Sequence, residues 1–391
     1  MMRVDEIKEH LIKDIIPFWQ SIKDAEFGGF YGEMDFDLNL YRMADKGCIL
    51  NSRILWFFSN AYMTLSQNEY LIYAEHAYEF LRKAFYDQEN GGVFWSVTYD
   101  GRPSDDTKHT YNQAFAVYGL ASYYGVTKDK EALALAYALV DRIENLCRDD
   151  IGYLEAFDRY FHPASNEKLS ENGVMASRTM NTLLHVLEAY TELYRVDRSE
   201  AVADKMRWML DLFIDKIYNP DKERLEVFFD HQMNSLLDLN SYGHDIEASW
   251  LVDRSVEILD DPDYTAKITP ITKALTSHIH SVAMDESSLY NECEKGEVDT
   301  KKVWWVQAEA ILGFLNGYQK DPTKKEYIDN VSKIWDFTKT YMIDHREGSE
   351  WFFELHKDGT PIVTREIVGP WKCPYHNGRM CFEVLNRKVR F

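Results

Sequence analysis

Residues 241–250, SYGHDIEASW, place a histidine and a glutamate three positions apart. On a helix, His244 and Glu247 would lie on the same face. Zinc-binding motifs such as HExxH combine the same residue types, but they need a second histidine four positions after the first, and alanine stands at that position here. The pair therefore indicates a positioned base rather than half of a metal site.

Similar polar and aromatic residues recur in five other segments whose apolar pattern predicts a helix. Arg53, Asn112, Asn181, His244, Trp305 and His376 follow one another at intervals of about 59 to 71 residues. Such regular spacing predicts that each segment occupies an equivalent place in a repeated unit. The other residues of this kind are Asn51, His109, Tyr111, His185, Glu247, Trp304, Glu309, Trp371, Tyr375 and Arg379.

Short stretches rich in glycine and aromatic residues recur with the same period. They are centred on Gly29, Gly92, Gly152, Leu225, Leu289 and Trp351, about 60 to 73 residues apart. Acidic turn residues followed by alternating aromatics predict small β-hairpins or extended loops. Between these stretches lie pairs of amphipathic helical patterns, such as MNTLLHVLEAYTELYRV at residues 180–196.

Six copies of about 62 residues, each with two helices and one hairpin, account for nearly the whole chain. We therefore expect an all-α fold, an (α/α)6 barrel of six helical hairpins with short β-hairpins or extended loops. An open solenoid would need polar terminal repeats, which are absent, so closure into a ring is favoured. No linker-like stretch divides the chain, and residues 1–391 are expected to form one catalytic domain.

In such a barrel the six inner helices run parallel, and their N-terminal ends meet at one mouth. The mouth would collect His185, His244 and His376 with arginine, glutamate and tryptophan side chains, and the positive helix ends would favour developing negative charge. A single histidine at a helix start is usually a cap or a core group, and paired tryptophans usually belong to the core. The common phase of all six segments is what favours an active site.

Composition excludes several classes of partner. The net charge of −21 argues against nucleic acid and anionic membranes, which need clustered lysine and arginine. The 25 Tyr, 21 Phe and 10 Trp suit a site for a small apolar ligand or a sugar. Five cysteines without a CxxC pair favour a reducing compartment. The first residues are charged throughout and no run of 18 apolar residues occurs, so we expect a cytoplasmic protein without a signal peptide. We also expect it to be a monomer.

Several motifs resemble those of the N-acylglucosamine 2-epimerase superfamily over essentially the full length. They are NSRILWFFSNAY, SENG ahead of TMNTLLHVLEAYTELY, SYGHDIEASWL, VWWVQAEA and GPWKCPYHNGRMC. The resemblance is closest to the members that act on cellobiose. It implies an (α/α)6 barrel, no metal, no cofactor and inversion of C2 in the reducing-end glucose of β-1,4-linked disaccharides such as cellobiose or lactose.

Inversion at C2 requires ring opening, loss of the C2 proton next to the aldehyde, and return of a proton to the opposite face of a cis-enediol(ate). Histidine suits both proton transfers because its usual pKa is near 6.5. The resemblance assigns these roles to His244 and His376, and ring opening to His185. Arg53 would hold O1 or O2, and Glu247 would accept a hydrogen bond from the His244 imidazole or from the sugar. The expected substrate-binding residues are Tyr111, Asn112, Asn181, Trp304, Trp305, Glu309 and Trp371.

Three other functions stay open on the sequence. The same barrel hosts inverting glycosidases, for which Glu247 and Glu309 would supply the two carboxylates, although a hydrolase does not explain three histidines. An aldose–ketose isomerase of the superfamily needs only one base on one face. A non-catalytic ring that binds a sugar or a protein is the third alternative.

Overall fold

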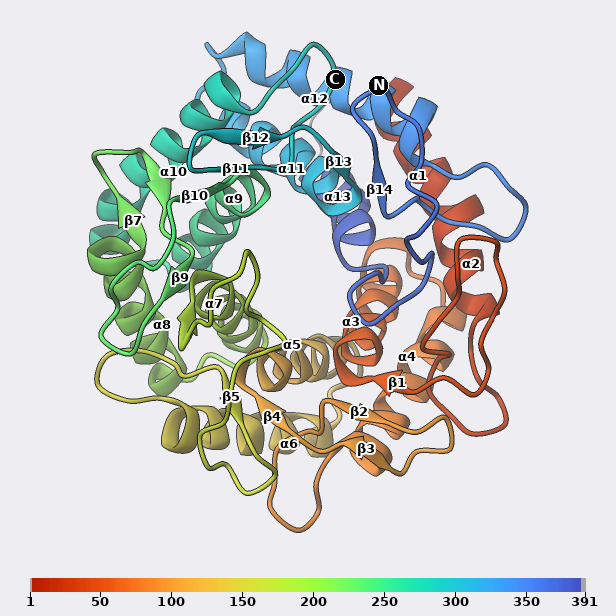
Figure 1. The fold of residues 1–391 in the computed structure, drawn as a ribbon. Helices are drawn as coiled ribbons and strands as arrows, with labels where there is room; N and C mark the ends of the chain where they lie inside the picture. Colours follow the sequence, from red (N-terminus) through yellow and green to blue (C-terminus); the bar gives the residue numbers. More distant parts are fainter. Residues whose placement is uncertain (1, 388–391) are drawn as a thin grey trace.

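Six helices form an inner ring in the computed structural model, which describes residues 2–387. Each of them contacts the next one along the chain, and the last returns to the first (Figure 1). They are α3 (Cys48–Leu65), α5 (Thr110–Thr127), α7 (Met180–Val196), α9 (Tyr242–Leu259), α11 (Trp304–Lys320) and α13 (His376–Arg387). Every segment that the phase relation singled out is one of these inner helices.

A second set of helices lies outside this ring (Figure 1). It consists of α4 (Glu69–Phe80), α6 (Lys130–Arg142), α8 (Glu200–Leu212), α10 (Pro262–Val282) and α12 (Lys325–Phe337). The N-terminal segment adds α1 (Met2–His10), the π-helical turn η1 (Leu11–Ile15) and α2 (Ile16–Ser21). Four of the other outer helices end in π-helical turns, which are η2 (Leu81–Phe85), η3 (Ile143–Cys147), η4 (Phe213–Ile217) and η5 (Thr338–Met342).

The inner helices are buried on most of their faces, which explains why their sequences are apolar nearly all round. Two glycines allow neighbouring inner helices to approach closely. A Cβ atom at Gly119 of α5 would lie 2.7 Å from the Ser52 carbonyl oxygen of α3, and one at Gly313 of α11 would lie 2.7 Å from the Ile246 carbonyl oxygen of α9. Any side chain there would push the inner helices apart.

A tight antiparallel turn follows each outer helix, at the positions where the sequence predicts hairpins. The paired residues are Lys23 with Phe30, Tyr86 with Val93, Arg148 with Tyr153, Tyr218 with Leu225, Met284 with Leu289 and Ile343 with Trp351. The predicted hairpins are therefore confirmed. Among these six described turns, only the one between β7 (Tyr218–Asn219) and β8 (Arg224–Leu225) has more than one bridged pair of residues.

Further short strands fix the N-terminal ends of the inner helices. A strand directly before five of these helices pairs with a strand from the following unit. The sheets are β1 (Lys46–Gly47), β2 (Ser96–Val97) and β3 (Pro103–Asp105); β4 (Lys108–His109) and β5 (Ala156–Phe157); β6 (Arg178–Thr179) and β9 (Phe228–Phe229); β10 (Leu239–Ser241), β11 (Glu292–Glu294) and β12 (Glu297–Asp299); and β13 (Lys302–Val303) and β14 (Glu354–Leu355).

Buried ion pairs tie several helix starts to the preceding turn. Lys46, two residues before α3, donates to Asp24 at 2.6 Å, and Lys108, two residues before α5, donates to Asp87 at 3.1 Å. Lysines and carboxylates are rarely buried unless paired, so these contacts require each turn to lie beside its helix. Equivalent pairs join Arg178 to Asp149, Lys302 to Asp285 and Lys372 to Glu350.

The N-terminal helices complete the last unit, because α13 has no outer helix after it among the described residues. Trp19 of α2 donates to Glu350 at 3.3 Å, and Trp351 donates to His10 of α1 at 2.7 Å. The two ends of the chain thus close the ring by side-chain contacts. No helix in residues 2–387 has both the length and the apolar character to cross a bilayer.

Candidate active site

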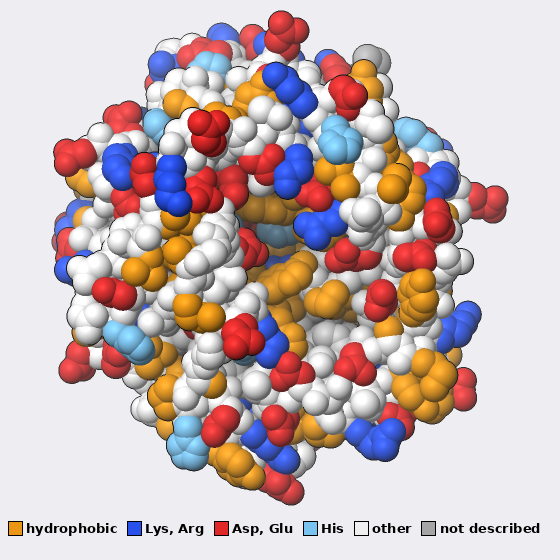
Figure 2. All heavy atoms as spheres, viewed as in Figure 1, with side chains coloured by type: hydrophobic (Ala, Val, Ile, Leu, Met, Phe, Trp, Pro, Cys, Tyr) orange, Lys and Arg blue, Asp and Glu red, His pale blue; other side chains and the backbone are white. Residues whose placement is uncertain are grey.

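A cavity of about 450 Å³ opens at the N-terminal ends of the inner helices. Figure 2 shows it as a central hollow with apolar walls, a histidine at its floor and charged side chains around its rim. Ten of the twelve residues predicted from the sequence line it, and all but Trp371 lie in the first two turns of an inner helix. They are Arg53, Tyr111, Asn181, His185, His244, Glu247, Trp304, Trp305, Trp371 and His376.

Two of the three histidines are held by carboxylates. His185 Nδ1 lies 2.8 Å from Glu188 Oε2, three residues later on α7. His376 Nδ1, at the start of α13, lies 2.7 Å from Glu309 Oε1 of α11. An ionised carboxylate only accepts, so each neutral imidazole carries its proton on Nδ1 and presents a bare Nε2. Neither Nε2 has a hydrogen-bond partner within residues 2–387.

The third histidine has a different partner. His244 Nδ1 lies 2.7 Å from the Ser241 hydroxyl, which stands three residues earlier at the end of β10. A hydroxyl both donates and accepts, so this contact permits either neutral tautomer. The His244 and His376 rings both lie beside Trp305, with ring centroids 4.8 Å and 5.4 Å from that of the indole. A sugar against Trp305 would therefore lie close to both imidazoles.

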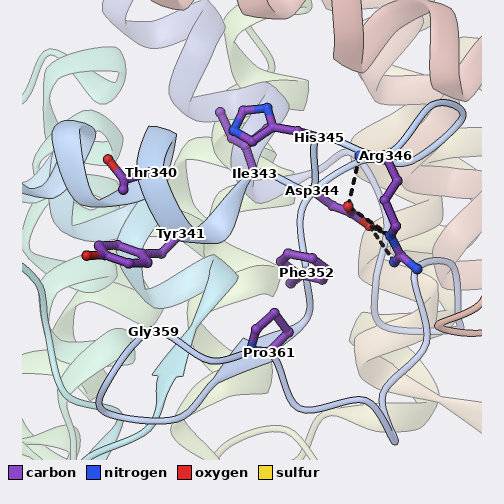
Figure 3. A pocket seen from close by; sticks show the side chains of 9 residues that line it. All are labelled: Thr340, Tyr341, Ile343, Asp344, His345, Arg346, Phe352, Gly359 and Pro361. Carbon is purple, nitrogen blue, oxygen red and sulfur yellow. Dashed lines mark hydrogen bonds and ion pairs between the residues drawn. The ribbon is translucent and has the colours of Figure 1, made fainter.

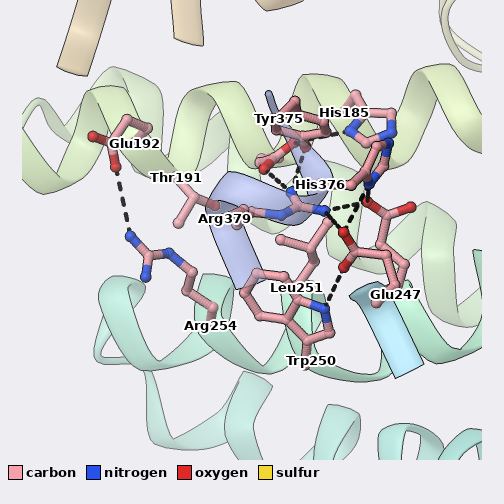
Figure 4. A network of polar contacts seen from close by, with 12 residues as sticks. His185, Thr191, Glu192, Glu247, Trp250, Leu251, Arg254, Tyr375, His376 and Arg379 are labelled. Atoms are coloured by element: carbon pink, nitrogen blue, oxygen red, sulfur yellow. Dashed lines mark hydrogen bonds and ion pairs between the residues drawn. The ribbon is translucent and has the colours of Figure 1, made fainter. Parts of the chain in front are cut away.

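Arg379 of α13 connects the carboxylates beneath the histidines (Figure 4). One terminal nitrogen donates to Glu188 and to the Tyr375 hydroxyl. The other donates to Glu247 and, at 2.7 Å, to Glu309. One buried guanidinium thus faces three buried carboxylates. Because the carboxylates outnumber the single positive charge, one of them is favoured to keep a proton.

The carboxylates differ in where that proton resides. Burial, reinforced by the neighbouring Glu309 charge, raises the pKa of Glu247 to about 8. Burial also raises the pKa of Glu309, against the opposing effect of Arg379. For Glu188 burial acts in the same direction, but Arg379 and His185 outweigh it and hold the pKa well below its usual range. Glu247 is therefore the group that carries a proton at neutral pH.

Burial favours the neutral form of all three imidazoles. It lowers the pKa of His244 to about 3, with a smaller contribution from His185. The pKa of His376 lies well below its ordinary value because of burial and the Arg379 charge, and burial lowers the pKa of His185 despite the Glu188 carboxylate. Neutral imidazoles can accept a proton from a substrate carbon.

Arg53 supplies a fixed cation on the opposite side of the cavity, on α3. One terminal nitrogen donates to the Tyr111 hydroxyl at 2.9 Å, and the guanidinium lies over the rings of Phe115 and Tyr375, 4.1 Å and 4.4 Å from their centroids. Its Nε is buried without a partner in the described part of the chain. Arg53 is thus rigidly placed, and because it lines the cavity, an N–H of a terminal nitrogen is the donor left for a ligand oxygen.

Aromatic rings form the remaining walls. The Trp304 ring lies 4.3 Å from that of Phe353, and Trp371 packs edge-on against Tyr111 at 5.7 Å and Trp95 at 5.9 Å. Flat apolar faces beside hydrogen-bonding groups match the alternating C–H and hydroxyl surfaces of a sugar.

Comparison with known proteins agrees with this geometry. A sequence model of the family described as N-acylglucosamine 2-epimerase (GlcNAc 2-epimerase) matches residues 29–378. The chain belongs to the N-acylglucosamine 2-epimerase family. It is 50% identical to a cellobiose 2-epimerase from Ruminococcus albus over 388 residues, which cover 99% of this chain and 100% of that protein.

Two solved structures of the same family have similar folds. A sugar epimerase from a ruminal bacterium is 49% identical, with a TM-score of 0.98 over 100% of both chains. The cellobiose 2-epimerase of Bacillus thermoamylovorans is 46% identical, with a TM-score of 0.95 over 98% of this chain and 99% of that one.

Three expectations about this family member need correction. Asn112 does not line the cavity, because its amide donates to the Phe94 carbonyl at 2.8 Å and the side chain is fully buried. Glu309 also lies outside the lining, behind His376 and hydrogen-bonded to Trp250 at 2.9 Å. Glu247 bonds Arg379 rather than His244. Contact between Glu247 and a sugar stays a prediction.

Glu188 and Ser241 bind histidines of the site, but neither was predicted from the sequence. Glu188 stands three positions after His185, the same spacing as His244 and Glu247, and this repetition was available in the sequence. Ser241 stands three positions before His244, but serine is common at helix starts and carries little signal. Arg379 is among the recurrent polar residues of the sequence but not among the predicted site residues, and the structure shows it contacting three carboxylates.

One group of side chains has the composition of a metal site. Ligand atoms of Glu247, Glu309 and His376 lie within 4.8 Å of one another. The Arg379 guanidinium donates to both carboxylates and already supplies positive charge there, so the donor set does not fit a divalent cation. Metal independence of the reaction remains a prediction.

A second hollow, on the outer surface, has fewer side chains that could take part in catalysis than the central cavity (Figure 3). It lies between the end of α12 and the following loop, and its charged residues Asp344 and Arg346 bind each other at 2.8 Å. The central cavity remains the candidate active site.

Proposed function

We propose that this protein inverts C2 of the reducing-end glucose in cellobiose and in related β-1,4-linked disaccharides such as lactose, which yields mannose at that end. The observation that carries the proposal is the pair of imidazoles, His244 and His376, which both line one cavity and both lie against Trp305. Inversion requires a proton carrier on each face of the substrate. The names of the relatives, cellobiose 2-epimerase, support the substrate class.

Ring opening comes first. His185 accepts the proton of the O1 hydroxyl at its Nε2, while the ring oxygen takes a proton as the C1–O5 bond breaks. Glu247, whose raised pKa favours the protonated form and which lines the cavity, is the source that we propose for that proton. The open chain carries an aldehyde at C1, which makes the C2 proton acidic.

Epimerisation follows on the open chain. One histidine removes the C2 proton with its Nε2, and the electron pair of the C–H bond moves into a cis-enediolate. Arg53 and the positive helix ends stabilise the negative charge that develops on O1 and O2. The other histidine enters this step as an imidazolium and delivers its Nε2 proton to the opposite face of C2, and ring closure reverses the first step.

An inverting glycosidase is disfavoured by the arrangement of its two candidate carboxylates. Such enzymes hold the carboxyl groups roughly 6.5–9.5 Å apart to admit a water molecule. Glu247 and Glu309 contribute oxygens within 4.8 Å of one another, both bonded to the same arginine nitrogen. Glu309 also lies outside the cavity lining.

The remaining features of the proposal concern the whole molecule. The closed inner ring and its outer helices support an (α/α)6 barrel formed by a single domain over the whole chain. The net charge of −21 supports a cytoplasmic protein without nucleic-acid or membrane partners. We propose that it acts as a monomer, without metal or cofactor.

Product analysis tests the proposal directly. The protein is incubated with cellobiose without added metal, and the sugars are resolved by chromatography. We expect 4-O-β-D-glucosyl-D-mannose. A ketose as the main product would assign an aldose–ketose isomerase, free glucose would assign a hydrolase, and unchanged cellobiose would favour a binding ring.

A further inference from the structure

Ser241 occupies the N-cap position of α9 but does not cap the helix. An N-cap serine normally accepts a hydrogen bond from the backbone N–H two or three residues later, which here belongs to Gly243 or His244. Ser241 makes no such bond, and its hydroxyl lies instead 2.7 Å from His244 Nδ1.

The equivalent residue on the neighbouring inner helix behaves normally. Thr179, the N-cap of α7, accepts from the Thr182 backbone at 3.0 Å. Both residues end a short strand, but their backbones differ, with ψ of 98° at Ser241 and 148° at Thr179, and Ser199 at the start of α8 also makes no capping bond. What distinguishes Ser241 is that its hydroxyl lies at His244 Nδ1.

The hydroxyl also differs chemically from the partners of the other two histidines. Glu188 and Glu309 accept hydrogen bonds from Nδ1, which keeps Nε2 bare in the neutral ring. The Ser241 oxygen can accept from Nδ1–H both in the neutral ring with a bare Nε2 and in the imidazolium with a protonated Nε2. The same hydrogen bond therefore holds the ring in both charge states, without an added negative charge.

We propose that Ser241 is a positioning residue of the epimerisation, which holds the His244 ring and lets its Nε2 face C2 either with or without a proton. The inference rests on the proposed function. In one direction, the C2–H proton passes to Nε2 of a neutral His376, while an imidazolium His244 gives its Nε2 proton to the opposite face of C2 and becomes the neutral ring whose Nδ1–H Ser241 accepts. In the reverse direction, His244 receives the proton. No group other than C2 and the two imidazoles changes its proton count.

The test compares three substitutions at one position. Ser241→Ala and Ser241→Gly remove the hydroxyl, and glycine remains acceptable at an N-cap. Ser241→Thr keeps the hydroxyl. We expect kcat on cellobiose to fall in the Ala and Gly variants by about 10- to 100-fold, the range seen for partners that orient metal-bound histidines, with KM unchanged. The Thr variant should keep most of the activity.

Deuterium exchange gives a readout that a structural role would not change. In deuterated water, each C2 epimer is supplied separately to the Ser241→Ala variant. For the epimer from which His376 removes the proton, we expect deuterium to enter C2 with retention faster than the epimer forms, because delivery by His244 is impaired. For the other epimer, exchange and inversion should fall together.

A matched control removes an ordinary cap. Asp129 caps the outer helix α6 by accepting from the Glu131 and Ala132 backbone, remote from the cavity lining. Asp129→Ala should lower the Tm and leave both kcat and the exchange ratio unchanged.

Four results would overturn the inference. Wild-type kcat in both hydroxyl-free variants would show that the hydroxyl is dispensable. A raised KM at unchanged kcat would assign it to sugar binding, and equal loss of exchange and inversion from both epimers would assign it to folding. A wild-type protein that forms no epimer would instead refute the proposed function, and the inference with it.

Discussion

The two sides of the cavity hold their histidines by different means. On the α9 side, His244 is supported by a neutral hydroxyl that belongs to the same helix start. On the side formed by α11 and α13, His376 is supported by the carboxylate of Glu309, which is itself bound by Arg379 and Trp250. One side is local and uncharged, and the other is a network across three inner helices.

The difference affects the chemistry of the two bases. A carboxylate at Nδ1 stabilises the imidazolium, so Glu309 favours proton uptake by His376. A hydroxyl stabilises both charge states to a similar extent, so Ser241 supports the His244 imidazolium less than a carboxylate would. The two bases thus differ in their immediate partners, while burial lowers the pKa of both and the Arg379 charge lowers that of His376 further.

The largest effect is expected when either side loses its imidazole. His244→Asn and His376→Asn should each reduce epimer formation by about 10²- to 10⁴-fold, the usual contribution of general acid–base catalysis. Asparagine preserves approximate size and some hydrogen bonding. In deuterated water, each variant should show at most slow C2 exchange with retention, measured by NMR. Substantial epimer from either variant would leave a single base, or Glu247, as the better assignment.

His185→Asn serves as the comparison for these two variants. His185 is expected to act at ring opening, before the C2 proton becomes acidic. This variant should therefore accumulate no exchanged sugar at all. Exchange at the wild-type rate would remove His185 from the ring-opening step.

Glu309→Gln makes the α11–α13 side resemble the uncharged α9 side. The amide no longer offers an ionised acceptor to His376 Nδ1, and kcat should fall by about 10- to 100-fold, as for partners of metal-bound histidines. Glu188→Gln alters the support of His185 instead and controls for loss of a carboxylate near Arg379. If Glu309→Gln retained wild-type kcat, the charged support of His376 would be irrelevant to catalysis.

The pH dependence of kcat tests the role of the proton on Glu247. Because burial raises the pKa of Glu247 to about 8, kcat should decline as pH rises through that value and Glu247 loses its proton. The same shift makes the folded state lose stability between pH ~4.5 and ~8, since there the unfolded chain alone releases this proton. Glu247→Gln should abolish both effects. A basic limb that persists in this variant would belong to another group.

Aromatic stacking should contribute less than the proton carriers. Trp305→Ala and Trp371→Ala should each reduce kcat/KM by a factor that corresponds to about 1–3 kcal/mol of transition-state stabilisation, if stacking on the sugar is lost completely. Trp305 touches both histidine rings, so we expect its loss to lower kcat, whereas loss of Trp371 should mainly raise KM. Near-wild-type kinetics in both variants would assign these rings to the core or the rim.

The smallest effect is expected from chelation. Arg379 supplies the positive charge between Glu247 and Glu309, so exhaustive treatment with EDTA should leave kcat unchanged. A loss of activity that a divalent cation restores would contradict this expectation.

The sequence alone was sufficient for the repeat, the inner helices and ten of the residues that line the cavity. Hydrophobic periodicity and turn composition are local properties, and a constant phase places equivalent residues at equivalent heights of a closed ring. For this reason, Arg53, His185 and His376 could be predicted to meet although hundreds of residues separate the first from the last.

The partners of those residues were decided by the tertiary structure. Ser241 and Glu247 stand three positions before and after His244, and spacing alone made the glutamate the expected partner. Arg379, from a helix 132 residues further along the chain, binds Glu247, and the Ser241 hydroxyl lies at His244 Nδ1 instead. Burial beside other carboxylates then keeps Glu247 protonated. Such choices depend on charge and desolvation among distant segments, which no local pattern records.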